Sequence, residues 1–282
     1  MRVREIIKDS LKYPFTDWKK FLILGIIFLI IEIIYISRNY GEKNVELLVL
    51  LTGIAFLVGI FVNGYIFRII NSSFDDKAEL PVFDNWVVMG LEGAKVYIVH
   101  IVYLIPTLLL LIYLILSTYG SMSYFGVNAF DLISAFNSVV WQGNSNFLGL
   151  IIFLGNTAAG GVVAHLGIIY PLGILYTIII TPILLVAIAN MVYDDGYLKS
   201  AFEIRVIVEE ISIIGWGNLI KWYVAIGIIF TIFAIISTIA VYISSLINQI
   251  FIEIIIALIL FPYFTIFLAR SLALFYLPDE ED

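Results

Sequence analysis

The stretch FLILGIIFLIIEIIYIS at residues 21–37 is long and apolar enough to cross a lipid bilayer as one helix. It is not typical of a signal peptide, because the apolar run is long and Arg38 follows it in place of a small-residue cleavage site. Further apolar stretches lie at about residues 46–70, 95–117, 169–193, 218–241 and 249–275. We therefore predict an all-α, multi-pass protein of the cell membrane.

The composition supports this class. Of the 282 residues, 62% are hydrophobic and only 13% are charged, too few charges to cover the surface of a soluble domain of this size. The net charge of −7 argues against a nucleic-acid partner, so the lipid bilayer is the expected partner. The chain has no cysteine and two histidines, and we expect no metal centre and no cofactor.

The distribution of Lys and Arg predicts the orientation, because these residues favour the cytoplasmic side. The first 20 residues are rich in them, residues 96–198 contain none, and residues 199–221 contain Lys199, Arg205 and Lys221. This pattern fits six crossings with both termini cytoplasmic. The small-residue segment 147–167 is then predicted to be re-entrant or interfacial. The alternative is a full span that breaks the charge rule.

The single membrane domain, 1–282, divides into three similar units at about 1–77, 78–196 and 197–282. Each unit starts with a Trp-containing cytoplasmic segment, here called the lead-in. It then crosses outward, returns through a second helix, here called the return helix, and ends on acidic residues. The three tryptophans are Trp18, Trp86 and Trp216. We predict a six-span bundle of three parallel in–out–in hairpins, with an outer insertion at about 118–168.

The lead-ins are predicted to be amphipathic. Val3, Ile6, Ile7 and Leu11 share one face of a helix that Pro14 limits. In the third lead-in, the apolar stripe consists of Ala201, Ile204, Val208, Ile211 and Ile214. The pattern at 81–93 is weaker. Such helices lie in the membrane interface or, alternatively, pack on the underside of the bundle.

Polar side chains inside the spans are candidate functional positions, because placing them in a bilayer is costly. These candidates are Glu32, Glu253, His100, Asn63 and Asn190. Glu32 would face a cavity, bind a cation or stay protonated, unless local water or Arg38 compensates its charge. If Glu32 and Glu253 face inward at one depth, they form an acidic site on the outer side. His100 and the two asparagines suit hydrogen bonds between helices.

Other residues have structural interpretations. Arg68 and Arg270 occupy matching places near the cytoplasmic ends of return helices, where anchoring and snorkelling to the interface are expected. Prolines inside the spans are expected to kink them. They are Pro106, Pro171, Pro182 and Pro262.

Three stretches resemble a known family: REIIKDSLKYPFTDWKKFLILG at 4–25, NGYIFRII at 63–70 and ELPVFDNW at 79–86. The segments IANMVYDDG, ISIIGWGNLIKWYV and FPYFTIFLARSLALFY fit the same pattern. Together they resemble an uncharacterised family of archaeal integral membrane proteins, a domain of unknown function. The resemblance implies an archaeal cell membrane. It implies no activity and assigns no functional residue.

The sequence contains no HExxH, GxSxG, GxxxxGK(S/T) or GxGxxG motif, which are typical of zinc proteases, serine hydrolases and nucleotide-binding proteins. We therefore expect a non-enzymatic protein that scaffolds partners or organises lipid, without catalytic, cofactor-binding or metal-binding residues. The alternative is a transporter or permease for a lipid-like or small polar solute. A protein partner would bind the cytoplasmic amphipathic segments or the outer loop.

Overall fold

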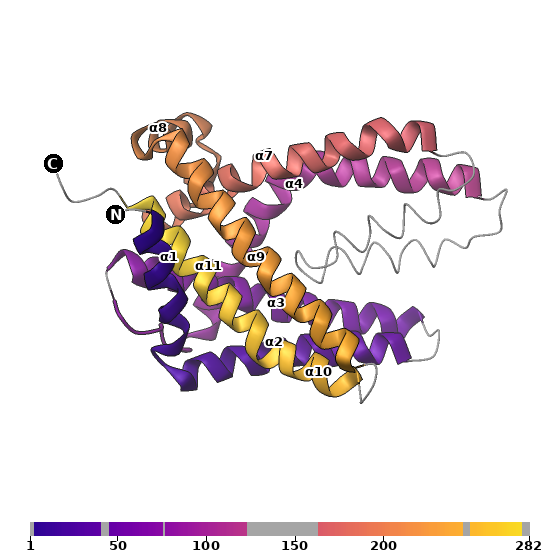
Figure 1. Ribbon diagram of the computed structural model, residues 1–282, viewed down its shortest axis with the longest axis horizontal. Helices are drawn as coiled ribbons and strands as arrows, with labels where there is room; N and C mark the ends of the chain where they lie inside the picture. The colour runs from indigo at the N-terminus through magenta and orange to yellow at the C-terminus, as the bar shows by residue number, and fades with distance from the viewer. Residues whose placement is uncertain (1–2, 41–44, 76, 123–162, 245–248, 278–282) are drawn as a thin grey trace. The chain divides into compact units, whose positions relative to one another are not determined.

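The computed structural model describes residues 3–40, 45–75, 77–122, 163–244 and 249–277, and the regular elements in these ranges are all helical. The elements are α1 (Val3–Lys12), η1 (Tyr13–Phe15), α2 (Trp18–Tyr40), α3 (Val45–Phe74), α4 (Trp86–Met122), α7 (Val163–Tyr193), η2 (Leu198–Phe202), α8 (Ile204–Ile214), α9 (Trp216–Ser244), α10 (Gln249–Ile255), η3 (Ile256–Leu260) and α11 (Phe261–Tyr276) (Figure 1). The predicted all-α class is confirmed.

Five helical stretches are long and apolar enough to cross a membrane, which is consistent with a multi-pass membrane protein. They are Val49–Phe74, Trp86–Leu110, Gly173–Tyr193, Trp216–Ala240 and Ile252–Tyr276. Each overlaps a predicted span, although Trp86–Leu110 begins nine residues before the predicted 95–117. The remaining predicted span, 21–37, lies within α2, which is not among these five.

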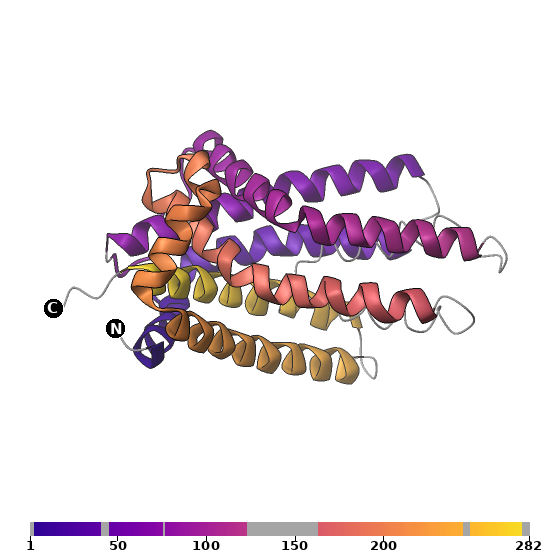
Figure 2. The same cartoon turned by 90° about the horizontal axis from the view of Figure 1, so that it is seen from above.

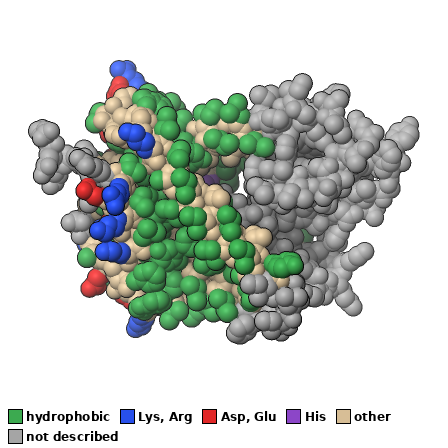
Figure 3. Space-filling model, in the orientation of Figure 1, with side chains coloured by type: hydrophobic (Ala, Val, Ile, Leu, Met, Phe, Trp, Pro, Cys, Tyr) green, Lys and Arg blue, Asp and Glu red, His purple; other side chains and the backbone are tan. Residues whose placement is uncertain are grey.

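The outer faces of the long helices are apolar, as a lipid environment requires. In α9, large apolar side chains that are at least half exposed recur along one side of the helix. They are Ile220, Val224, Ile228, Ile232, Ile235 and Ile239. Figure 3 shows hydrophobic side chains covering this part of the surface. Water would not tolerate so continuous an apolar face, whereas lipid chains would.

The chain forms two compact units, one of residues 1–100 and 182–282 and the other of residues 101–181. In the first unit, α2, α3, α9 and the α10–α11 helix run side by side (Figures 1 and 2). The elements α1, η1, η2 and α8 lie at one end of this unit, together with the segment 77–85. We call this the lead-in end.

Close helix contacts in the first unit depend on glycine. A Cβ atom on Gly64 of α3 would lie 1.9 Å from the carbonyl oxygen of Met89, and one on Gly93 of α4 would lie 1.9 Å from that of Ile60. A Cβ on Gly25 of α2 would lie 2.4 Å from the Leu258 carbonyl oxygen in η3. The backbones therefore approach each other more closely than any larger residue permits.

The last helix is irregular where proline interrupts its hydrogen-bond ladder. The segment Ile256–Leu260 is π-helical, and Pro262 lies in the first turn of the α-helix that follows. Since proline has no N–H to donate, a change of helix type next to it is a local way to accommodate the lost bond.

The second unit is a pair of helical segments from α4 and α7. Tyr176 donates a hydrogen bond of 3.0 Å to the carbonyl oxygen of Tyr103, and the hydroxyls of Thr107 and Thr177 are 3.2 Å apart. Hydrogen bonds of this kind hold helices together within a membrane, where hydrophobic burial alone gives little preference for helix association.

The lead-ins differ from one another. A helix is present at the N-terminus as α1, which is followed by the turn η1 containing Pro14. The expectation of a helix before each hairpin is wrong for the middle lead-in, since residues 77 and 80–85 have no regular structure, residues 78 and 79 bend, and α4 begins at Trp86. The predicted re-entrant segment 147–167 and the insertion 118–168 lie mostly outside the described residues.

Replacement of Gly64 by alanine tests the close approach of α3 and α4. We expect Gly64→Ala to reduce the stability of the protein by about 1–3 kcal/mol, because the new methyl group would clash with backbone atoms. Thermal unfolding in detergent measures the effect. The matched control is Gly227→Ala in α9, where a Cβ would meet no atom within 4 Å. Equal stability of the two variants would contradict the close contact.

Candidate functional site

The segment 77–85 joins α3 to α4 without regular structure. Apart from Asn85, whose carbonyl oxygen accepts from the Met89 N–H, its carbonyl oxygens need donors from outside a helix. Side chains from several surrounding elements supply them. Arg270 donates to Lys77, Tyr13 to Glu79, Lys20 to Leu80, Tyr65 to Pro81, and Arg68 to Val82, Asp84 and Asn85. The irregular path of this segment is thus fixed by side chains from η1, α2, α3 and α11.

Arg68 is the most highly bonded of these donors. Its Nε atom lies 3.0 Å from a Glu92 carboxylate oxygen, and its Nη1 atom lies 2.8 Å from a carboxylate oxygen of Asp84. The side chain is only 13% exposed. The expectation that Arg68 snorkels to the interface is therefore wrong, because its guanidinium group is committed to carboxylates and backbone carbonyls.

Arg270 joins the last described helix to the first. Its Nε atom lies 3.0 Å from a carboxylate oxygen of Asp9 in α1, and its guanidinium carbon lies 4.7 Å from the centre of the Tyr13 ring. The side chain is 6% exposed, so snorkelling is wrong here too. A desolvated cation over an aromatic face gains cation–π stabilisation in addition to the ion pair.

Two groups in this network have shifted pKa values. Burial raises the pKa of Tyr13, so its hydroxyl stays protonated and donates at 2.9 Å to the Glu79 carbonyl oxygen. Hydrogen bonding from Lys20 lowers the pKa of Asp17, whose carboxylate also accepts from the backbone N–H of Lys19. Both groups are therefore held in the protonation state that their contacts require.

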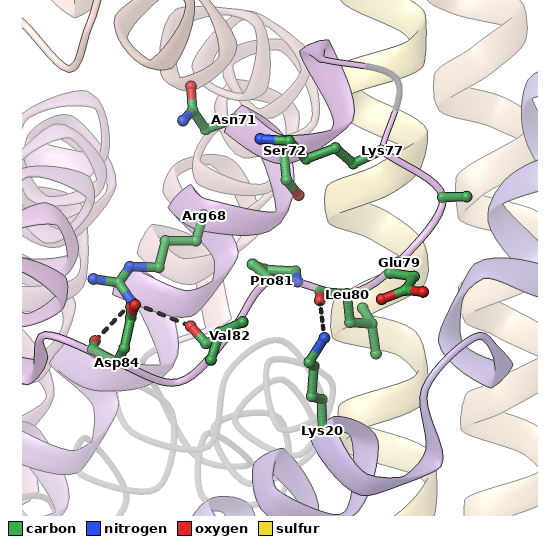
Figure 4. A pocket seen from close by; sticks show the side chains of 11 residues that line it. Lys20, Arg68, Asn71, Ser72, Lys77, Glu79, Leu80, Pro81, Val82 and Asp84 are labelled. Carbon is green, nitrogen blue, oxygen red and sulfur yellow. Dashed lines mark hydrogen bonds and ion pairs between the residues drawn. The ribbon is translucent and has the colours of Figure 1, made fainter.

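A recess with a volume of about 670 Å³ opens beside the segment 77–85. It is lined by Lys20, Arg68, Asn71, Ser72, Lys77, Ala78, Glu79, Leu80, Pro81, Val82 and Asp84. Figure 4 shows Lys20 and Arg68 reaching the segment from opposite sides. This recess is the candidate site that the lead-in end offers.

The charges around the recess are largely balanced within the fold. Arg68 and Lys20 bind carboxylates and carbonyl oxygens, and Lys77 pairs with Asp75 at 2.7 Å. Glu79 and Asp84 add negative charge to the lining. Among the described residues, no group of three or more His, Asp or Glu side chains is placed to hold a metal ion. The arrangement suits a rigid polar joint better than a charged binding pocket.

The three return helices meet at the lead-in end through aromatic rings. Phe74 ends α3, Tyr193 ends α7 and Tyr276 ends α11. The ring centres are 5.5 Å apart for Phe74 and Tyr193, 5.9 Å for Phe74 and Tyr276, and 5.6 Å for Tyr193 and Tyr276. These spacings are typical of favourable aromatic contacts, so the three rings form one cluster.

Asn190 belongs to this meeting point. It is 6% exposed, accepts a hydrogen bond of 2.7 Å from the Tyr276 hydroxyl, and donates one of 2.9 Å to the Ser200 carbonyl oxygen. These bonds join α7 to α11 and η2, which gives Asn190 a structural position at a helix junction.

Two other candidates bond within their own helices. Asn63 donates to the Gly59 carbonyl oxygen at 2.9 Å, and the Nδ1 atom of His100 lies 2.9 Å from the Val96 carbonyl oxygen. Such bonds to the residue four positions earlier satisfy a polar group without a partner helix. Neither residue lines the recess.

Glu32 lies in α2 and Glu253 lies in α10, and these two elements pack against each other. An acidic site formed by the two residues stays a prediction. Both side chains are half-buried. The side chain of Arg38, the other suggested partner of Glu32, lies outside the described part of the structure.

The sequence analysis missed Tyr13, Lys20 and Tyr65, which hold the segment 77–85. A signal was present, because Tyr65 and Arg68 belong to NGYIFRII and the carbonyls they bind belong to ELPVFDNW. Two of the stretches that carried the family resemblance, 63–70 and 79–86, are therefore bonded to each other.

A family model described as a protein of unknown function, DUF4013, matches residues 47–242, more than half of the chain. The chain belongs to this family. The DUF4013 match includes Tyr65, Arg68 and the segment that they bind, whereas α1, α2 and α11 lie outside it. No curated protein and no solved structure matches the chain. The predicted resemblance to a family of unknown function is confirmed, and an archaeal origin stays a prediction.

Replacement of Arg68 by lysine tests whether the bonds from Arg68 hold the segment 77–85 in place. We expect Arg68→Lys to lower stability by about 2–4 kcal/mol, because one ammonium group cannot replace the guanidinium bonds to Glu92 and the segment 77–85. Faster hydrogen–deuterium exchange in residues 77–85 should accompany a lower melting temperature in detergent. The control Arg205→Lys changes an ion pair with Glu209 in which Arg205 is 91% exposed, and should have little effect. Unchanged exchange in Arg68→Lys would contradict this assignment.

Proposed function

We propose that this DUF4013 protein is a non-enzymatic, six-span membrane scaffold that organises the lipid around it. The observation that carries the proposal is the network of hydrogen bonds and ion pairs at the lead-in end. In this network, Arg270 and Tyr263 of the last helix, α11, bind Asp9 and Leu11 of the first helix, α1. This network uses the charged groups of that end to fix the relative positions of helices rather than to form a reactive site.

The tryptophans support six spans in three parallel hairpins. Trp18, Trp86 and Trp216 are the first residues of α2, α4 and α9, and they are 55%, 48% and 46% exposed. Half-exposed tryptophan favours the boundary between lipid and water. Three outward helices starting with Trp are expected if α2–α3, α4–α7 and α9–α11 are repeats of one unit.

The contacts between units support a ring of repeats. Tyr65 and Arg68 of the first return helix bind the second lead-in, and Asn190 of the second binds Ser200 in the third. Arg270 of the third return helix binds Asp9 in the first lead-in. Each return helix thus holds the lead-in of the next unit, and the last holds the first. This order favours a pseudo-threefold bundle.

The lead-in helices α1 and α8 differ in what their apolar sides contact. In α1, Ile6 is 3% exposed and its neighbours Val3, Ile7 and Leu11 are half-buried, so the apolar face packs on the bundle. In α8, Ile207 and Ile211 are buried while Ile204, Val208 and Ile213 are exposed. We assign the exposed apolar side of α8 to the membrane interface, where it adds to the lipid-facing surface of α9.

Cysteine labelling on intact cells tests the six spans and the cytoplasmic placement of both termini. The natural chain has no cysteine, so it serves as the unlabelled control. We expect an impermeant thiol reagent to label Asp131→Cys and Ser245→Cys from outside, and Tyr197→Cys only after permeabilisation. Tyr197 is preferred to Gly196, which has a φ angle of +73° and would place a Cβ 2.9 Å from Phe67. External labelling at residue 197 would overturn the proposed orientation.

The placement of the half-buried Glu32 and Glu253 on two helices that pack together favours a transporter as the second candidate. Two neighbouring carboxylates within membrane helices are a common element of proton and cation pathways. The recess, however, is lined by neither residue and lies at the lead-in end. We therefore place the scaffold function first.

Flux measurements separate the two candidates. If the protein is a scaffold, proteoliposomes containing it should pass protons, sodium and potassium no faster than protein-free vesicles. Glu32→Gln should then change nothing. Ion flux that Glu32→Gln and Glu253→Gln both abolish, while Glu46→Gln leaves it intact, would favour the transporter and refute the scaffold.

A further inference from the structure

One side of α1 carries a stripe of positive charge. Arg4, Lys8 and Lys12 follow one another at intervals of four residues, which places them on the same side of a helix. All three are exposed, as is Lys19 at the start of α2. None of the four has an ion pair with any residue that the structure describes.

Most other basic side chains in the described ranges are engaged. Bonds to carboxylates or backbone carbonyls are made by Lys20, Arg68, Lys77, Lys95, Lys199, Arg205 and Arg270. Lys221 is exposed and unpaired within the same ranges. Unpaired positive charge is therefore concentrated on and next to α1, in a chain whose net charge is −7.

The opposite side of α1 is firmly held. Ile6 and Ser10 are buried, Asp9 pairs with Arg270, and the Leu11 carbonyl oxygen accepts a hydrogen bond of 2.8 Å from Tyr263. The helix cannot rotate without breaking these contacts, so the basic stripe points permanently away from the bundle. The carboxylates on α1 are Glu5, which is exposed, and Asp9, which is bound to Arg270.

The stripe lies close to the expected membrane surface. Lys12 precedes Trp18 by six residues, with η1 between them, and the half-exposed Trp18 indicates the level of the interface. Figure 3 shows basic side chains exposed at the lead-in end, next to the apolar surface of the helices. Basic side chains at this level reach the phosphate layer of a bilayer.

We propose that Arg4, Lys8 and Lys12 bind the anionic headgroups of phospholipids in the leaflet at the lead-in end. The inference rests on the proposed function, since it names the lipid class that the bundle organises. Each basic residue close to an anionic membrane surface strengthens binding about fivefold at low salt. Charge complementarity favours a lipid partner over an acidic protein, because headgroups are present at high density beside the stripe.

Native mass spectrometry of the purified full-length protein tests the proposal. The protein is titrated with phosphatidylglycerol and with phosphatidylcholine that carries the same acyl chains. We expect tighter binding of phosphatidylglycerol, and a loss of about fivefold per charge in the triple variant Arg4→Gln, Lys8→Gln, Lys12→Gln. Binding of phosphatidylcholine should not change, and raising the ionic strength should reduce the preference.

Two further variants make the test specific. The variant Lys199→Gln, Arg205→Gln, Lys221→Gln removes the same charge elsewhere. It should keep most of the preference, because Lys199 and Arg205 are paired with Glu203 and Glu209. The variant Arg4→Lys, Lys8→Arg, Lys12→Arg should keep all of it. Melting temperatures in detergent verify that every variant is folded.

Three outcomes would overturn the proposal. One is the lack of a preference for phosphatidylglycerol in the natural protein, and another is an unchanged preference in the triple glutamine variant of Arg4, Lys8 and Lys12. The third outcome is an equal loss in the triple glutamine variant of Lys199, Arg205 and Lys221. Displacement of the lipid by an equal concentration of inorganic phosphate would also overturn it, because the site would then recognise a soluble ion. External labelling at residue 197, which would overturn the proposed orientation, can be distinguished from these outcomes. It would move the stripe to the other leaflet without removing the lipid preference.

Discussion

The hydrogen bonds to the carbonyl oxygens of residues 77–85 are the constraint on which the first unit depends. A segment without regular structure beside a membrane must still satisfy its backbone N–H and C=O groups. It lacks the regular hydrogen bonds that a helix or a sheet would provide. Five side chains supply the donors, from η1, α2, α3 and α11. The same bonds therefore satisfy the segment and fix four elements relative to one another.

The two buried arginines favour one arrangement of neighbouring helices over other arrangements, in addition to stabilising it. Removing Arg68 and Arg270 from water is costly, and the ion pairs with Glu92 and Asp9 recover that cost only when the geometry is met. A packing of the helices that separated α11 from α1 would leave the Arg270 charge without its partner. We consider these two arginines to be determinants of which helices meet, since apolar surfaces in lipid discriminate poorly between neighbours.

The three proposed repeats, at about 1–77, 78–196 and 197–282, differ in detail. Arg68 and Arg270 each lie six residues before the aromatic residue that ends the return helix, whereas Ala187 occupies that place in the second unit. There Asn190 contacts the next lead-in instead, through the Ser200 carbonyl oxygen. Gly25 and Gly93 both follow a tryptophan by seven residues and both sit at close helix contacts, but Tyr223 stands at the third such position. The end cluster of Phe74, Tyr193 and Tyr276 is a feature to which all three proposed repeats contribute.

The sequence by itself determined the helices, because apolar runs such as 46–70 and 218–241 extend over a bilayer thickness and have few structural alternatives. It also determined that α1 ends shortly before Pro14, and it determined the family to which the chain belongs. Only the tertiary structure decided the partners of the polar residues. Arg270 and Asp9 are at opposite ends of the chain, and the bond from Tyr65 goes to a backbone oxygen that any residue would present. Hydropathy and charge placement depend on one segment at a time, whereas these contacts depend on which helices are neighbours, and that is fixed by packing over the whole unit.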